Sequence, residues 1–242
     1  MSQTMHMLAE DYEPPQTADS IVLSPTVINF PASQLFVPQI VEVDIINPMG
    51  YSIRLRGVTC NRTEFQIGHL KKVEIPSRHL YRVPIVFLPT QVGKTDTHIT
   101  FSTEDGMVRV VRVRGQGTPN IYKVRSLSNI TIPIDTGIAA PISIYNPLKS
   151  TYKVKEVFTT ERFLHLRLPE TPGKEGKPST AMLWEIKPRE QKRIIDLTFQ
   201  SSIPGLFIGF IHIRTQDVNM IVPIQIKVLK ESVNLRPTQL NF

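Results

Sequence analysis

The sequence has little of what disulfide frameworks, metal sites and membrane spans require. Among its 242 residues there is one cysteine, Cys60, which excludes an internal disulfide framework and any metal site built from several cysteines. The longest apolar run, residues 203–213, is interrupted by Pro204 and two glycines. It is far shorter than the roughly 20 residues that cross a bilayer. We therefore expect no membrane span within this chain.

The amino terminus also lacks the features of a secretion signal. The stretch MSQTMHMLAEDYEPP has no basic start and no apolar core, so we expect no signal peptide. Residues 1–19 carry four acidic residues and neither lysine nor arginine. We predict that they form a flexible acidic leader.

Elsewhere basic residues outnumber acidic ones. The chain has 28 lysines and arginines against 21 aspartates and glutamates, a formal net charge of +7. Such a balance favours acidic partners or serves solubility. Because the charges alternate with apolar residues, as they do on solvated strand faces, we favour solubility.

The sequence contains an internal repeat. The stretch IVLSPTVINF at residues 21–30 returns as VNLRPTQLNF at 233–242, and VDIINP at 43–48 returns as ISIYNP at 142–147. The spacing gives units of about 100 residues, the size of an immunoglobulin-like sandwich. We predict a first domain at 20–117, a second at 118–231 and the first strand of a truncated third module at 232–242.

Each unit has the period of strands. In QIVEVDIINP three apolar residues alternate with Glu42 and Asp44, as expected for a half-buried strand. The stretch THITFSTEDGMVRVVRV forms two alternating runs around Asp105-Gly106, which is a strong hairpin signal. No segment has convincing helical periodicity. We predict an all-β protein made of two tandem immunoglobulin-like β-sandwich domains.

No arrangement of residues indicates an enzyme. VGKT at 92–95 lacks the earlier glycine and the following helix of a phosphate-binding loop, and GQG at 115–117 has the character of an interdomain linker. The six histidines are scattered, and a lone Cys60 is more often a small core residue than a nucleophile. We expect no catalytic residue, metal, cofactor or small-molecule substrate.

Nucleic-acid binding is also disfavoured. Arg109, Arg112 and Arg114, followed by Lys123 and Arg125, form a basic stretch, but aromatic residues for base stacking are missing from it. We therefore interpret the stretch as an exposed edge or linker face.

The last strand of the first unit, MVRVVRVR at 107–114, is the candidate interaction site. Edge strands carry unpaired N–H and C=O groups with which another chain can pair. In the alternative reading its valines are simply core. The candidate interface residues are Val108, Arg109, Val110, Arg112 and Arg114.

Two glycosylation sequons occur, at Asn61 and Asn129. They permit a lumenal location without requiring one, because one or two are expected by chance.

Several motifs, in order, resemble the N-terminal lumenal region of the transmembrane protein 131 family. They are TPNIYKVR at 118–125, ISIYNP at 142–147, LHLRLP at 164–169 and LWEIKP at 183–188. More broadly, the units resemble PapD-like and major-sperm-protein-like sandwiches, and together the likeness covers about residues 20–242.

The resemblance implies a single-pass protein of the endoplasmic reticulum membrane. Its lumenal PapD-like domain would recruit procollagen chains, or other protein segments by strand addition, for assembly and secretion. Because signal peptide, membrane helix and tail are absent from this sequence, we interpret the chain as a fragment or an alternative product of such a protein.

Two other functions stay open. One is a cytoplasmic or ciliary scaffold module that binds linear peptide motifs, and the other is a spacer that presents the working domains of a longer protein. Trp184 could anchor an interface, although a single tryptophan beside Leu183 and Ile186 is more often core.

Overall fold

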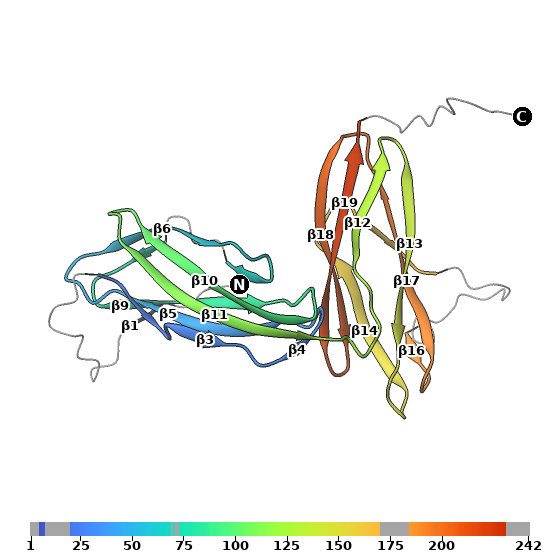
Figure 1. Ribbon diagram of the computed structural model, residues 1–242, viewed down its shortest axis with the longest axis horizontal. Helices are drawn as coiled ribbons and strands as arrows, with labels where there is room; N and C mark the ends of the chain where they lie inside the picture. Colours follow the sequence, from blue (N-terminus) through green and yellow to red (C-terminus); the bar gives the residue numbers. More distant parts are fainter. Residues whose placement is uncertain (1–4, 8–19, 69, 71–72, 170–183, 231–242) are drawn as a thin grey trace, which may run out of the picture. The chain divides into compact units, whose positions relative to one another are not determined.

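The computed structural model describes residues 5–7, 20–68, 70, 73–169 and 184–230 (Figure 1). The chain divides into two compact units, Met1–Pro119 and Asn120–Phe242. The described residues form strands and turns and contain no helix, which confirms the all-β prediction. Nothing in this part of the chain is a helix long and apolar enough to cross a membrane.

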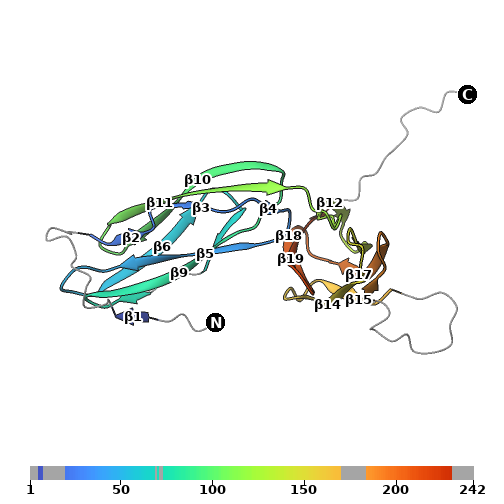
Figure 2. The same ribbon diagram turned by 90° about the horizontal axis from the view of Figure 1, so that it is seen from below.

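Unit 1 is built from two sheets, which form two layers in Figure 2. Its strands are β1 (Met5–Met7), β2 (Val22–Ser24), β3 (Val27–Asn29), β4 (Ser33–Gln34), β5 (Gln39–Ile46), β6 (Ile53–Cys60), β7 (Phe65–Ile67), β8 (Glu74–Ile75), β9 (His79–Phe87), β10 (Gly93–Thr103) and β11 (Val108–Thr118). One sheet has the order β1-β9-β5-β2, with β7 also on β9. The other has the order β3-β11-β10-β6-β8, with β4 also on β11.

The core of unit 1 lies between these sheets. Alternate residues of each long strand point inward, as in β9, where Tyr81, Val83, Ile85 and Phe87 are buried. Phe87 stacks on Phe65 with ring centroids 5.1 Å apart, and Phe30, which closes the repeated stretch, lies 5.5 Å from Phe87. Phe30, the last residue of the repeated stretch, therefore packs in the core.

Unit 2 has the same two-sheet construction. Its strands are β12 (Leu127–Pro133), β13 (Gly137–Tyr145), β14 (Tyr152–Thr159), β15 (His165–Arg167), β16 (Glu185–Ile186), β17 (Gln191–Gln200), β18 (Gly205–Thr215) and β19 (Asn219–Leu229). The sheets have the orders β12-β19-β18-β14-β16 and β13-β17-β15.

Two segments differ from the prediction. The GQG stretch is not a linker: Gly115 and Gly117 continue β11 and pair with Thr95 and Gly93 of β10. A Cβ on Gly115 would lie 2.5 Å from the Phe87 ring, so this glycine makes room for a core side chain. Within the predicted leader, Met5–Met7 form β1, which pairs with β9.

Other predicted segments cannot be compared with the structure. The rest of the leader and the predicted third module at 232–242 lie outside the described residues.

Candidate functional site

Part of β11 has a neighbouring strand on one side only. β11 pairs with β10 along Val108–Gly117. On its other side β3 pairs in parallel with Arg112–Arg114, and β4 pairs with Gly117 and Thr118. Among the described strands none pairs with Val108–Val111 on that side. We call this segment the open edge.

The direction of the backbone groups follows from two hydrogen bonds. Arg112 N donates to Thr26 O (2.9 Å), and Phe30 N donates to Arg114 O (2.8 Å). The backbone groups of Arg112 and Arg114 therefore point away from β10. Because the β10–β11 register is uninterrupted and the direction alternates with period two, the N–H and C=O of Val108 and Val110 point the same way. They face the open edge.

The open edge arises where the chain passes from one sheet to the other between β2 and β3. β2 pairs with β5 in one sheet, whereas β3 pairs with β11 in the other. The crossing falls between Ser24 and Val27, and the parallel pairing of β3 starts only at Arg112. The preceding residues of β11 are left without a partner on that side.

Some valines of β11 belong to the core, and others are exposed at the open edge. Val111 and Val113 are fully buried, so part of the strand is core. Val108 and Val110 are 50% and 44% exposed, and Val27, the cross-strand neighbour of Arg112, is 45% exposed. The outer face at the open edge is therefore apolar.

Two of the predicted arginines are already engaged. Arg112 Nη2 and Arg114 Nε lie 2.8 and 3.1 Å from Asp96 Oδ2. Hydrogen bonds from Arg112 and then Arg114 lower the pKa of Asp96 to about 2, so this carboxylate stays charged. Arg109 Nη1 donates to Val108 O (3.0 Å) and covers one acceptor of the open edge.

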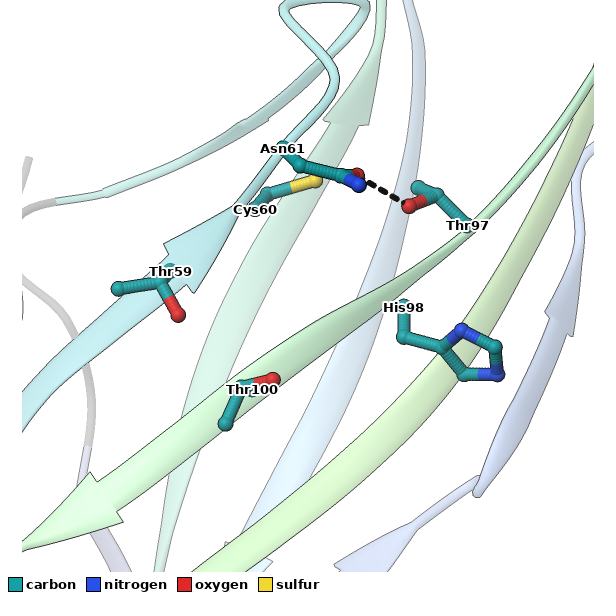
Figure 3. Close-up of a pocket in the computed structure, with 6 residues that line it drawn as sticks. All are labelled: Thr59, Cys60, Asn61, Thr97, His98 and Thr100. Atoms are coloured by element: carbon teal, nitrogen blue, oxygen red, sulfur yellow. Dashed lines mark hydrogen bonds between the residues drawn. The ribbon is translucent and has the colours of Figure 1, made fainter.

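A polar cavity of about 350 Å³ lies on the neighbouring strands (Figure 3). It is lined by Thr59, Cys60, Asn61, Thr97, His98 and Thr100. Thr59 pairs with Thr100, which in turn pairs with Val110 of the open edge. Cross-strand neighbours share a face of the sheet, so the open edge and part of the cavity wall lie on one surface.

The geometry of Cys60 does not resemble that of a catalytic nucleophile. The half-buried thiol donates to Arg62 O (3.5 Å), and no hydrogen bond joins it to His98 in the described part of the chain. Within the same residues no group of histidine, cysteine and carboxylate side chains could hold a metal ion.

Both predicted sequons lie at exposed positions. Asn61 follows β6, and its Oδ1 accepts a hydrogen bond from Thr97 (Figure 3). Asn129 has a φ of 62° and lies where the register of β12 against β19 shifts.

The Trp184 side chain, which the sequence offered as a possible interface anchor, is half-buried, and its Nε1 donates to Ile194 O (3.1 Å).

Two buried asparagines that no sequence motif singled out as functional each make several hydrogen bonds. Asn47 is fully buried; its Nδ2 donates to carbonyls of Tyr51, Ile75 and Pro76, and its Oδ1 accepts from Met49 N. Asn146 makes the equivalent bonds to Ser150, Ile186, Lys187 and Leu148. The repeated Asn-Pro dipeptide was the available signal.

Two family models match most of the chain. The one described as "Transmembrane protein 131-like N-terminal" covers residues 21–103, and "Transmembrane protein 131 second Ig-like domain" covers residues 121–214.

Curated relatives agree with these models. Transmembrane protein 131 of Mus musculus is 26% identical over 86% of this chain and 11% of its own length. The Drosophila melanogaster homolog is 25% identical over 79% of this chain and 12% of its own length. The chain thus spans about a tenth of these relatives.

Two solved structures that match the chain at low sequence identity are a PapD-like domain and a bacterial chaperone. The "ASH / PapD-like domain of human CEP192" is 13% identical, covers 50% of this chain and 98% of its own, and has a TM-score of 0.39. The Pseudomonas aeruginosa CupB2 chaperone is 10% identical, covers 86% of this chain and all of its own, and has a TM-score of 0.31.

Proposed function

The chain belongs to the transmembrane protein 131 family, and on that premise we propose that it is a non-enzymatic binding module that recruits procollagen chains at the lumenal side of the endoplasmic reticulum membrane. Its immunoglobulin-like domains are of a kind that binds other proteins. Procollagen and the lumenal location come from what the family resemblance implies.

The observation that carries the proposal is the open edge of β11. Its backbone groups at Val108 and Val110 face away from β10, and the adjoining outer face is apolar. An extended segment that adds here gains main-chain hydrogen bonds, and the valines give it an apolar contact. The added strand displaces the Arg109 side chain from Val108 O.

The edge accommodates only a short strand. β3 already occupies the backbone of Arg112, so the added strand must stop beside Thr26. The buried area is small, and contacts of this size are weak and transient, with total burial below about 1,200 Å². Release of the partner after recruitment is compatible with such a contact.

Substitution of Val110 tests the mechanism. Val110→Pro removes an N–H that faces the open edge, so the β10 ladder keeps its hydrogen bonds while strand addition is blocked. Val110→Ala is the matched control, because it keeps the N–H and loses only part of the apolar contact. We expect saturable binding of purified procollagen chains to the wild-type chain, weaker binding to Val110→Ala and none to Val110→Pro.

Other outcomes separate the alternatives. Equal procollagen binding by all three proteins would contradict the edge mechanism. Failure of the wild-type chain to bind procollagen, with capture of peptides from a soluble linear-motif library, would contradict the recruiting role and favour the scaffold function. A longer protein that binds its partner without both units would favour the spacer.

The lumenal location has its own test. We expect the family protein that contains this chain to carry a glycan at Asn61 or Asn129, both of which are exposed. Treatment of the cell-derived protein with an N-glycosidase should then raise its gel mobility, and Asn61→Gln with Asn129→Gln should remove that shift. An unglycosylated protein in cells would favour the cytoplasmic alternative.

A further inference from the structure

A second unpaired edge lies in unit 2, and a cavity adjoins it. β13 pairs with β17 along its whole length, and no described strand pairs with its other edge. Near the end of β13, Tyr145 N donates to Tyr122 O (2.8 Å). The segment that follows Tyr122 leaves this edge and reaches β19 of the other sheet, where Leu127 pairs with Ile224. The cavity, about 300 Å³, lies at this departure.

We propose that this cavity binds a carboxylate side chain of an acidic, extended polypeptide segment. Its walls combine basic, hydroxyl and amide side chains with the edge of β13. Those used in the argument are Lys123, Arg125, Ser126, Pro141, Ser143 and Gln191.

The backbone of β13 supplies a donor to the cavity. Tyr145 N points to the open side, whereas Asn146 N donates to Glu190 O (2.8 Å) on the β17 side. The register shift between β13 and β17 leaves the extra residue, Ile194, on β17, so β13 alternates regularly. By period two, the N–H of Ser143 points toward the cavity, and so does the carbonyl of Pro141.

Pro141 limits what can bind there. A proline at an outward-facing position costs no bond to β17, yet it offers no N–H to an added strand. Strand addition therefore stops at this residue, in contrast to the open edge of β11. What remains is the Ser143 N–H beside two cations, which suits an anionic side chain.

The two cations are available. Lys123 Nζ lies 4.2 Å from the centroid of the Tyr145 ring, which holds the ammonium group at the cavity. Neither Lys123 nor Arg125 forms an ion pair within the part of the chain that the structure describes. Asp196, the neighbour of Pro141 on β17, is engaged by Arg193. The cavity thus has positive charge without a carboxylate of its own.

The composition of the walls favours a polypeptide over a nucleotide. Stacking of a base requires an exposed aromatic face. The Tyr145 ring at this edge is covered by the ammonium group of Lys123, which lines the cavity. The volume is at the lower end for small-molecule sites and fits one acidic side chain with its backbone. The half-buried Leu127 gives the cavity an apolar wall that fits the aliphatic part of a glutamate.

This site is independent of the open edge of β11, and its test is independent too. The full chain, labelled with ¹⁵N, is titrated with a hexaglutamate peptide, and the amide signals of Ser143 and residues 123–127 are followed by NMR. The pocket variant combines Lys123→Gln with Arg125→Gln. The control variant, with the same change in charge, combines Lys149→Gln with Lys155→Gln, which are exposed elsewhere on unit 2.

We expect saturable shifts centred on Ser143 and residues 123–127. The affinity should fall about tenfold or more in the pocket variant, because two charge-assisted contacts are lost, and less than about twofold in the control variant. Lys123→Gln alone should give an intermediate loss. All variants change exposed side chains, so their spectra should otherwise match that of the wild type.

Three outcomes would overturn the proposal. Shifts spread over all surface lysines, or an equal loss in both double variants, would show general charge attraction only. Inorganic phosphate that saturates the same amides as tightly as hexaglutamate would show an anion site without preference for a polypeptide. Stronger shifts with a single-stranded oligonucleotide would assign the site to nucleic acid.

Discussion

Asn47 and Asn146 make equivalent hydrogen bonds in the two units. In each case the side-chain amide faces three backbone carbonyls, and its oxygen accepts the N–H two residues ahead. Both side chains are fully buried. An amide supplies two N–H donors for the carbonyls and an oxygen that accepts an N–H at the same site, whereas an ionised carboxylate of the same size can only accept. The repeated Asn-Pro dipeptide therefore fixes how a strand leaves the sheet and meets the segment before β9 or β17.

Replacement of either amide by a carboxylate should be strongly destabilising. In Asn47→Asp or Asn146→Asp a group without N–H faces three carbonyls, and we expect the free energy of unfolding to fall by about 3 kcal/mol. Urea unfolding measures the loss, and hydrogen exchange assigns it to the unit that carries the change. The exposed Asn219→Asp should stay within about 0.5 kcal/mol of the wild type. Equal losses at all three positions would contradict this account.

The ion pairs of Asp96 predict a dependence of stability on pH. Arg112 and Arg114 lower the pKa of Asp96 to about 2 in the folded chain, whereas an unfolded aspartate titrates near about 3.9. The contribution to stability is therefore complete above about pH 5 and is lost as the pH falls through about 2. Because these side chains are partly exposed, salt should weaken it.

The measurement compares the wild type with Asp96→Asn. The difference between their free energies of unfolding should be greatest at low salt near neutral pH, and it should disappear only as the pH falls below about 2. A difference that grows on acidification would show that Asp96 is not held in its charged form.

At the scale of elements, the alternation of apolar residues and the turn signals predicted where strands and hairpins form, which composition alone does not. The runs around Asp105-Gly106 correctly indicated the β10–β11 hairpin, because strand period and turn chemistry are local properties. The extent of β11 could not be predicted in the same way. Gly115 and Gly117 suggested a linker, yet they lie in the strand and pair with β10. Glycine is needed there because Phe87 and the Gln91 carbonyl leave no room for a Cβ.

A pair of glycine substitutions tests this explanation. A Cβ at Gly115 would lie 2.5 Å from the Phe87 ring, whereas a Cβ at Gly57, also in a strand, would meet no atom within 4 Å. Gly115→Ala should lower the free energy of unfolding by about 1–3 kcal/mol through overpacking. Gly57→Ala should be neutral or stabilise the chain by up to about 1 kcal/mol. Thermal unfolding compares the two, and similar effects would contradict a packing role for Gly115.

The candidate sites mark another limit of sequence reasoning. The basic stretch from Arg109 to Arg125 looks continuous in the sequence, but it divides between β11 of unit 1 and a cavity wall of unit 2. Which valines face the open edge depends on where β3 joins β11, and that is a contact between distant residues. The sequence therefore predicted strand β11, but it did not predict which strands pair with it on its second side.

At the scale of the whole molecule, every described strand pairing joins strands of the same unit. The open edge belongs to unit 1 and the basic cavity to unit 2. We therefore expect residues 1–119 and 120–242, produced separately, each to fold and to keep its own site. Circular dichroism and the two binding experiments above check this. Loss of the strand spectrum in either fragment would show that the unit depends on the other.

The proline after each buried asparagine has a consequence for chemical ageing. Asparagine deamidates when the N–H of the following residue attacks its side-chain carbonyl and closes a succinimide ring. Pro48 and Pro147 have no N–H, so this route is closed at Asn47 and Asn146. Its products would include aspartate, the substitution expected to destabilise each unit. The two Asn-Pro dipeptides thus block this route of deamidation at the two buried amides.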